Sequence, residues 1–150
     1  MNARFGRNGI SPIILRESHH GPEDVYRLYR AADFCYVGSL RDGMNLVAKE
    51  FVAAQNPDDP GVLILSRFAG AAHECAAALL VNPYDPEGVG NAINRALSMP
   101  LEERRQRHAA TFKVLMRNDL GHWAERFLRM LNHPPGSADT VPLARAAGRR

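Results

Sequence analysis

Short apolar runs alternate with longer amphipathic segments over the first half of the chain. The runs are rich in Val, Ile and Leu and show little polar alternation, which is typical of strands covered on both faces. Strands are predicted at residues 12–16, 34–37, 62–66 and 78–81, and helices at residues 23–32, 46–55 and 71–75. This order predicts an α/β fold in which crossover helices connect the strands of a parallel sheet.

The pattern becomes helical after Pro83. A helix with Pro86 in its first turn is predicted to bury one apolar stripe, because proline is tolerated there and the apolar residues recur at helical spacing. The stripe consists of Val89, Ile93, Ala96 and Leu97. Pro100 then interrupts the chain, and a charged helix is predicted at residues 101–117. Its inward side chains are expected to be Phe112, Leu115 and Met116.

A last amphipathic helix is predicted to begin after Asp119, which is a suitable N-cap. Its apolar positions follow the i, i+3, i+4 spacing of one helix face. They are Leu120, Trp123, Phe127 and Leu131. The spacing predicts that Trp123 is buried in the core.

The two ends of the chain differ from the middle. Residues 1–9 are polar and contain glycine, so they are predicted to form a loop, with no strand and helix before them to supply the usual first half of a nucleotide-binding sheet. Residues 132–150 hold Pro and Gly but no large apolar cluster, which predicts a disordered basic tail. Residues 1–131 are therefore predicted to form one domain that is incomplete at its start.

Charge and composition exclude several classes of partner. The net charge is +3, but residues 1–131 hold 16 Lys and Arg against 15 Asp and Glu, so most of the basicity lies in the tail and no nucleic acid is expected to bind. No apolar run approaches the roughly 20 residues of a membrane helix, and no apolar leader is visible, so we expect a cytoplasmic protein without membrane contact. Cys35 and Cys75 lie in apolar surroundings and are expected to be buried, reduced thiols.

The densest candidate chemistry lies at residues 39–50, where a predicted strand leads through a glycine turn into a helix. Open parallel sheets bind ligands at the carboxyl ends of their strands, where this turn lies. Gly43 permits close backbone approach, Asn45 is a predicted N-cap, and the amides from Met44 to Val47 with the helix dipole suit an anion such as a diphosphate. Glu50 lies five residues after Asn45, which is about 7.5 Å along the helix axis at roughly 1.5 Å per residue. Its carboxylate is therefore within reach of the ribose hydroxyl of a ligand whose phosphates bind the amides.

Each of these residues also has a commoner structural role. Asp42 can be a turn residue, Asn45 a simple cap and Glu50 a solvated helix charge. A functional role is favoured by the combination of an acid at the strand end with a second acid on the following helix, flanking a glycine turn. A metal site is not predicted, because His73 and the adjacent His19 and His20 have no second imidazole or thiol at ligand spacing.

The same segment carries a specific motif. Residues 41–55, which read RDGMNLVAKEFVAAQ, resemble the donor-site signature of the trehalose-6-phosphate synthase family. The likeness continues in order through residues 61–72 with Glu74, residues 81–85, 118–119 and 122–123, and it spans residues 2–131. These enzymes are retaining glycosyltransferases of the GT-B type, with two facing Rossmann-like domains. The resemblance implies glucosyl transfer from UDP-glucose to glucose 6-phosphate in trehalose biosynthesis, with release of UDP and no resident metal or cofactor.

Carried over by position, the resemblance assigns roles to single residues. Asp42 is the implied catalytic residue, which hydrogen-bonds hydroxyls of the transferred glucose. Glu50 accepts a hydrogen bond from the UDP ribose, and His20 flanks the uracil ring in place of an aromatic residue. The sugar and diphosphate are held by backbone groups of Gly43, Met44, Asn45, Leu46 and Val47. The amides that follow Gly70, at a second strand end, are expected to face the donor sugar as well.

The resemblance covers only the C-terminal, donor-binding part of such an enzyme. It implies a partial Rossmann-like sheet and an incomplete UDP-sugar-binding domain in residues 1–131. The family's acceptor-binding domain and its Arg/Lys pair, which neutralises the leaving diphosphate, precede the matched region, so we expect the isolated chain to be inactive. The expected partners are UDP or UDP-glucose and a separate N-terminal chain or full-length relative. The alternative is a non-catalytic nucleotide-sugar-binding or interaction module.

Overall fold

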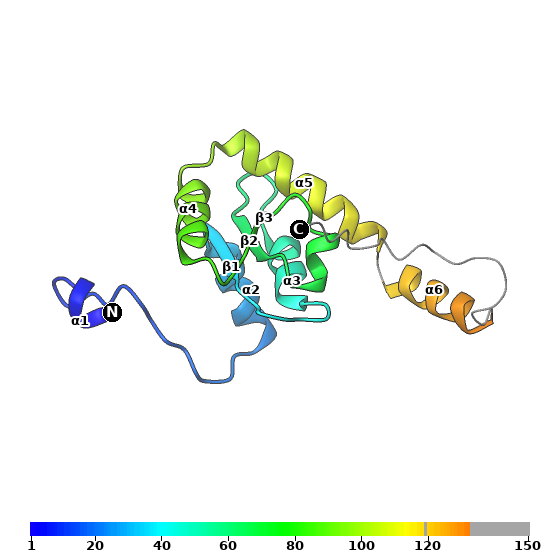
Figure 1. The fold of residues 1–150 in the computed structure, drawn as a ribbon, viewed down its shortest axis with the longest axis horizontal. Helices are drawn as coiled ribbons and strands as arrows, with labels where there is room; N and C mark the ends of the chain where they lie inside the picture. Colours follow the sequence, from blue (N-terminus) through cyan, green and yellow to red (C-terminus); the bar gives the residue numbers. More distant parts are fainter. Residues whose placement is uncertain (119, 133–150) are drawn as a thin grey trace, which may run out of the picture.

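The computed structural model describes residues 1–118 and 120–132. These residues form a three-stranded parallel sheet with the order β1-β2-β3 and with helices packed against it (Figure 1). β1 spans Phe34–Val37, β2 spans Val62–Ser66 and β3 spans Leu79–Val81. The predicted α/β fold, with a partial Rossmann-like parallel sheet, is confirmed.

Helices connect the strands, as the crossovers of a parallel sheet require. Before and between the strands lie α1 (Asn2–Phe5), α2 (Pro22–Ala31), α3 (Leu46–Ala54) and the short 3₁₀ helix η1 (Gly70–His73). After β3 follow α4 (Pro86–Leu97), α5 (Leu101–Arg117) and α6 (Leu120–Asn132). The helical C-terminal end is therefore confirmed as well.

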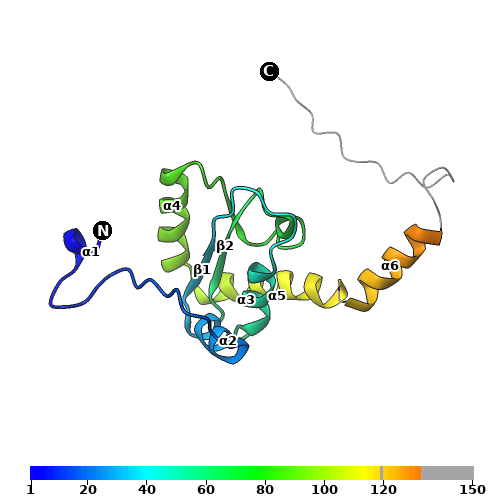
Figure 2. The same ribbon diagram turned by 90° about the horizontal axis from the view of Figure 1, so that it is seen from below.

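The central strand β2 is buried at every position, which explains its unbroken apolar sequence. Leu63 and Leu65 belong to a core cluster with residues of α3 and η1, whereas Val62 and Ile64 belong to a second cluster with residues of α4. In Figure 2, α4 lies on one side of β1 and β2 and α3 lies on the other. Alternate residues of one strand thus supply the two cores.

The predicted strand at residues 12–16 is wrong. Ile14 and Leu15 are 73% and 77% exposed, and the segment runs away from the sheet toward α1 (Figure 1). A strand needs a neighbour for its backbone N–H and C=O groups, and the contact made here is with the Asn2 side chain, which donates to the Ile13 carbonyl at 2.8 Å and accepts from its amide at 3.0 Å. Residues 2–5, expected to be a loop, form the single helical turn α1.

The predicted apolar stripe of α4 is confirmed except at its last residue. Ala96 is buried, and Val89 and Ile93 pack against the same core cluster. Leu97 is 61% exposed, because one further residue turns the side chain by about 100° from Ala96.

The predicted inner face of α5 is largely wrong, because this helix contacts the domain through polar side chains. Phe112 and Met116 are exposed, and only Leu115 packs against the core. The inner face instead donates to backbone carbonyls. Arg104 Nη1 lies 2.6 Å from the Pro60 oxygen, and Arg107 Nη1 lies 2.8 Å from the Ala77 oxygen.

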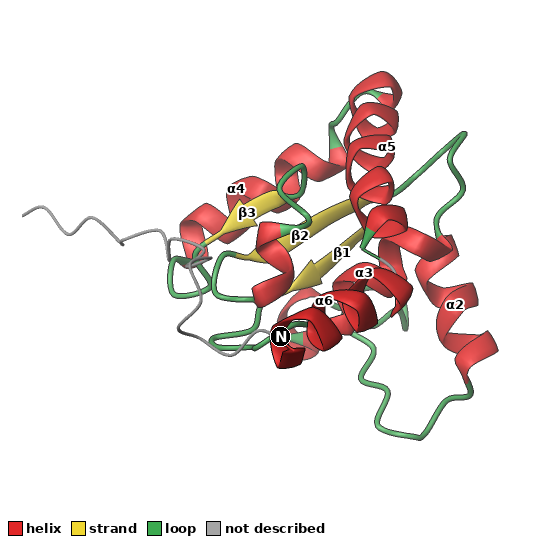
Figure 3. Ribbon diagram, turned by 90° about the vertical axis from the view of Figure 1, so that its right-hand side faces the viewer, coloured by secondary structure: helices red, strands yellow, loops and turns green. Residues whose placement is uncertain are grey.

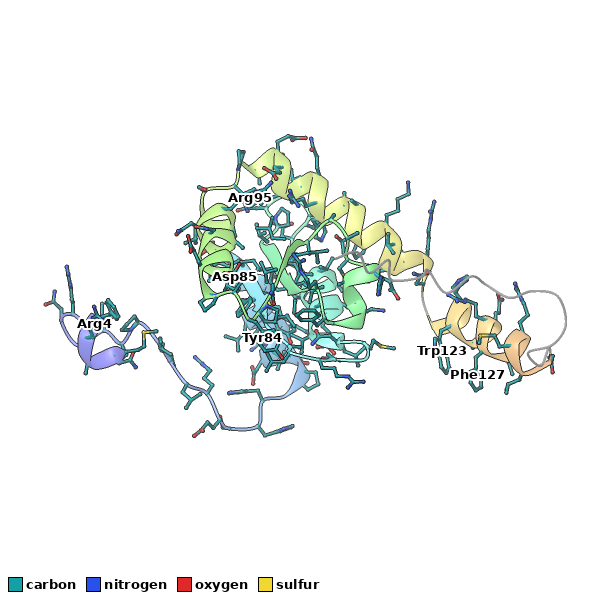
Figure 4. The ribbon with its side chains drawn as sticks, in the orientation of Figure 1. Arg4, Tyr84, Asp85, Arg95, Trp123 and Phe127 are labelled. Carbon is teal, nitrogen blue, oxygen red and sulfur yellow. The ribbon has the colours of Figure 1, made fainter. Side chains whose placement is uncertain are left out.

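The prediction that Trp123 is buried is also wrong. Trp123 is 54% exposed on α6, where its ring stacks on that of Phe127 at a centroid distance of 5.3 Å (Figure 4). Helix α6 projects away from the sheet (Figures 1 and 2), so its apolar face lines an open groove instead of a core. Asp119, the predicted N-cap, and residues 133–150 of the predicted tail lie outside the described residues. Asn132, which was expected to begin the tail, is the last residue of α6.

Candidate donor site

The candidate site lies at the carboxyl ends of β1 and β2. The strand arrows in Figure 3 point the same way, so the loops that follow them gather at one edge of the sheet. The loop after β1 carries Asp42 and leads into α3, and the loop after β2 leads into η1. The two loops touch, since Asp42 and Ala69 form an isolated parallel bridge.

Asp42 organises its own loop. One carboxylate oxygen, Oδ1, accepts from the Met44 amide at 3.1 Å. The other, Oδ2, accepts from Asn45 Nδ2 at 2.9 Å and from Ser39 Oγ at 3.5 Å. The hydrogen bonds from the Asn45 side chain and the Met44 amide lower the pKa of Asp42, so the carboxylate is ionised at neutral pH.

Asn45 is confirmed as the N-cap of α3. Its side-chain oxygen accepts from the Ala48 amide at 2.9 Å, while its amide nitrogen donates to Asp42. Its backbone has φ 77°, in the left-handed region that few residues other than glycine and asparagine adopt. The hydrogen bonds at both ends of the side chain therefore stabilise an unfavourable backbone conformation that joins the Asp42 turn to the helix.

The stretch of open amides is shorter than the sequence predicts. The Met44 amide is occupied by Asp42, whereas the amides of Leu46 and Val47 donate to no group within residues 1–118 and 120–132. Both lie in the first turn of α3, where the helix dipole favours an anion.

The surroundings of the two glycines of the site differ. At Gly43 an added Cβ would meet nothing within 4 Å, so no neighbouring part of the described chain requires a glycine there, and the close approach of a ligand to Gly43 stays a prediction. The amides after Gly70 do not face an open site, because Gly70 N donates to the Asp42 carbonyl at 3.0 Å and Ala71 N to the Met44 carbonyl at 2.6 Å.

Glu50 is half-buried on the side of α3 that faces α2. Burial and the nearby Glu50 carboxylate raise the pKa of Tyr29. The Glu50 carboxylate also lines an open groove of about 550 Å³ between α2 and α3, beside Tyr26, Arg27 and Arg30. Glu50 is therefore not a fully solvated helix charge, and the groove leaves room for a ligand beside it.

His20 lies just before α2, where its Nε2 is 3.4 Å from Ser18 Oγ. It lines an open pocket with Arg16, Asp24, Arg27 and Leu28. Arg27 lines both this pocket and the groove at Glu50. His20 and Glu50 thus line two pockets that share one arginine, whereas Asp42 lies in the loop before α3.

Several contacts at or near the motif were not revealed by its spacing. Lys49 Nζ and Glu74 Oε2 form a half-buried ion pair at 2.8 Å, which joins α3 to the end of η1. Phe68 and Tyr84, which follow β2 and β3, place their rings 6.0 Å apart beside the site. An ion pair between residues 25 positions apart carries no local sequence signal.

The described part of the chain contains neither a metal cluster nor a helix that could span a membrane. Among residues 1–118 and 120–132, no group of three His, Cys, Asp or Glu side chains is arranged to hold a metal ion. Cys35 and Cys75 are free thiols, and burial raises the pKa of each to about 11. No helix in the described part of the chain has the length and apolar character of a membrane span.

A parallel sheet with crossover helices, and with a helix N-terminus at its carboxyl edge, is the arrangement of a Rossmann-like domain. Residues 1–133 match the model of glycosyltransferase family 20. The chain therefore belongs to glycosyltransferase family 20.

Known relatives are similar over most of this chain. The trehalose-6-phosphate synthase of Enterobacter sp. (strain 638) is 53% identical over 131 residues, which cover 87% of this chain and 28% of the relative. The E. coli enzyme bound with UDP-2-fluoro glucose superposes with a TM-score of 0.85 at 47% identity, over 89% of this chain and 30% of that one.

A Burkholderia xenovorans synthase in complex with glucose-6-phosphate superposes equally well, with a TM-score of 0.85 at 47% identity. It is matched over 87% of this chain and 29% of its own length. The chain thus spans less than a third of the length of these relatives.

Proposed function

We propose that this chain is the donor-binding part of a retaining glycosyltransferase similar to trehalose-6-phosphate synthase, acting in the cytoplasm. The observation that carries the proposal is the turn that holds the Asp42 carboxylate on the Met44 amide and leads directly to the open amides of Leu46 and Val47. A sugar diphosphate presents hydroxyls and an anion side by side, and this pair of groups complements it. The E. coli relative with its bound UDP-sugar analogue supports the same assignment.

Each candidate residue has capacity left for the donor. A carboxylate has about four acceptor sites, so Asp42 can still accept from a glucose hydroxyl beside its bonds within the loop. Glu50 can likewise accept from the ribose, because it lines the open groove between α2 and α3. The diphosphate is proposed to bind the open amides, and His20 is proposed to flank the uracil ring.

The proposed reaction transfers glucose from UDP-glucose to glucose 6-phosphate with retention, and UDP leaves. Stabilising the charge that develops on the leaving diphosphate is often the largest catalytic term. Lys49, the cation of the motif helix, is held by Glu74 instead. We therefore assign leaving-group neutralisation and acceptor binding to a polypeptide that corresponds to the remaining length of the relatives, and we expect no trehalose 6-phosphate from this chain alone.

A second candidate is a nucleotide-sugar-binding or interaction module without catalysis. It is favoured by the ion pair of Lys49 with Glu74, which leaves backbone amides and carboxylates as the groups that face the ligand. Such a site can bind a sugar diphosphate without activating it. Mixing the chain with a full-length relative that has been inactivated at its own donor site separates the two. Restored turnover supports the transferase part, and binding without turnover supports the module.

Donor binding itself is tested by NMR titration of the labelled chain with UDP and UDP-glucose. Shifts are expected at residues 43–47, and Glu50→Ala should weaken UDP by roughly 10 to 150-fold, since a hydrogen bond to a charged group contributes about 1.5–3 kcal/mol. Glu102→Ala, on the far helix α5, is the matched control and should bind like the wild type. A folded wild-type chain without shifts at residues 43–47 at saturating UDP-glucose would contradict the proposal.

A further inference from the structure

We infer that Gly70 is a positioning residue for the donor site, because only a residue without a side chain lets η1 hold the Asp42 loop in place. The inference rests on the proposed function for its ligand, but its structural part concerns this chain alone. Gly70 touches no proposed donor atom and acts through the peptide that joins Gly43 to Met44.

The loops after β1 and β2 continue the parallel pairing of their strands. The Asp42 amide donates to the Phe68 carbonyl at 3.3 Å, and the Gly70 amide donates back to the Asp42 carbonyl at 3.0 Å. One step further, the Ala71 amide donates to the Met44 carbonyl at 2.6 Å. The backbone of the Asp42 loop is therefore fixed by the start of η1 on both sides of Gly43.

The start and the end of η1 are both held by contacts with the rest of the domain. Ala69 and Ala71 are 2% and 1% exposed and belong to the core cluster under α3. The ion pair of Lys49 with Glu74 joins the far end of η1 to the same helix. Because η1 is packed against the core, it cannot move away from the Asp42 loop to relieve a contact that is too close.

The contact at Gly70 has no room for a side chain. A Cβ on Gly70 would overlap the Gly43 carbonyl oxygen and would lie 2.8 Å from the Gly43 carbonyl carbon and 3.2 Å from Met44 Cα. All three are backbone atoms, so no rotamer change relieves the clash. The φ of Gly70 is not in the left-handed region, so contact and not backbone conformation requires the glycine.

The loop must therefore move if Gly70 carries a methyl group. The displaced peptide contains the Met44 amide that holds Asp42 Oδ1, and Asn45, which holds Oδ2, follows directly. A shift of about 1 Å in a positioned group is enough to lower activity by about 100-fold in enzymes. The glucose contact of Asp42 should suffer most, whereas Glu50 lies on another face of α3 and should keep its ribose contact.

The experiment compares Gly70→Ala with Gly90→Ala in the labelled full chain. Gly90 lies in α4 and an added Cβ there meets nothing within 4 Å, so it is a matched control. Without ligand, Gly70→Ala should move the Met44 and Asn45 amide resonances and speed exchange of the Ala71 amide, whereas Gly90→Ala should not. Unchanged Met44 and Asn45 resonances in a folded Gly70→Ala chain would overturn the inference.

Ligand titration adds a readout that general destabilisation would not give. The wild type is expected to bind UDP-glucose roughly tenfold or more tightly than UDP, and Gly70→Ala should remove this preference. The affinity for UDP itself should stay within about twofold of the wild-type value. Equal weakening of both ligands would overturn the positioning role. If the wild type itself does not respond to UDP-glucose, the proposed function fails, and the ligand-free spectra still decide the role of Gly70.

In case Gly70→Ala does not fold, a second pair of variants tests the contact between η1 and the Asp42 loop without adding a side chain at Gly70. Lys49→Glu places two carboxylates together and should speed exchange of the Ala71 amide. The exchanged pair, Lys49→Glu with Glu74→Lys, should restore slow exchange. Failure of Lys49→Glu to change the Ala71 amide, or of the double variant to restore it, would show that η1 is not held in this way.

Discussion

The sheet layer and the two end segments of the described chain carry similar apolar sequences but bury them very differently. In the sheet layer, Ile64 and Leu65 are fully buried and Phe51 on α3 is 1% exposed. In the end segments, Ile14 is 73% exposed and Leu131 is 62% exposed. An apolar spacing therefore predicts which side of an element could be buried, and only a facing surface decides whether it is.

Helices α4 and α6 show this difference although their sequences have a similar amphipathic pattern. Both are amphipathic, but α4 packs Val89 and Ile93 against the sheet, whereas α6 turns Trp123 and Phe127 to an open groove. The stabilisation from burial is proportional to the apolar area removed from water. Packing should therefore concentrate the stability of the described chain in residues around β2 and contribute little through α6.

The largest expected effect comes from truncating a phenylalanine in each region. Phe51→Ala should lower the free energy of unfolding by about 3–5 kcal/mol, because it removes a buried ring that packs edge-on against Tyr29 and leaves a cavity. Phe127→Ala, on the half-exposed face of α6, should stay within about 0.5 kcal/mol of the wild type. Urea denaturation of both variants measures the difference, and equal losses would contradict the comparison.

The sequence predicted the central strand better than the inward face of helix α5. The run Val62–Ser66 is apolar throughout, so its strand and its burial on both faces followed from pattern alone. Helix α5 was misjudged because its inner face binds backbone carbonyls through Arg104 and Arg107. Long side chains that donate at their tips are not distinguished from solvated charges by periodicity.

The candidate site divides in the same way. Asp42 and Asn45 are three residues apart, so their turn and cap could be predicted from local chemistry. The need for glycine at Gly70 and the pairing of Lys49 with Glu74 depend on how two strand-end loops meet in space. No local pattern carries that information.

A smaller effect is expected at the junction between the Asp42 turn and α3. Asn45→Ala removes the cap of Ala48 and leaves alanine at a φ of 77°, so it should destabilise the chain by about 1–2 kcal/mol. It should also raise the pKa of Asp42 toward its usual value, because the Asn45 side chain is the main cause of the lowered pKa. Carboxyl NMR titration of wild type and variant measures this shift.

The sign of the pH dependence follows from the lowered pKa. The Asp42 turn contributes stability above the ordinary aspartate pKa near 3.8, and this contribution is lost as pH falls through the lower native value. Glu103, whose pKa is lowered by the hydrogen bond from Arg107, is the internal control and should titrate alike in both proteins. An Asp42 pKa that does not change in Asn45→Ala would contradict the hydrogen-bonded turn.

The smallest expected effect is optical and concerns α6 alone. Trp123 is the single tryptophan of the chain, so its fluorescence reports on that helix without subtraction. Because the ring is 54% exposed, its emission should be close to that of tryptophan in water and acrylamide should quench it efficiently. The spacing of Leu120, Trp123 and Phe127 predicted the opposite, a shielded ring. Blue-shifted emission with weak quenching in the isolated chain would show that α6 is packed, and Phe127→Ala should then lower stability as a core substitution does.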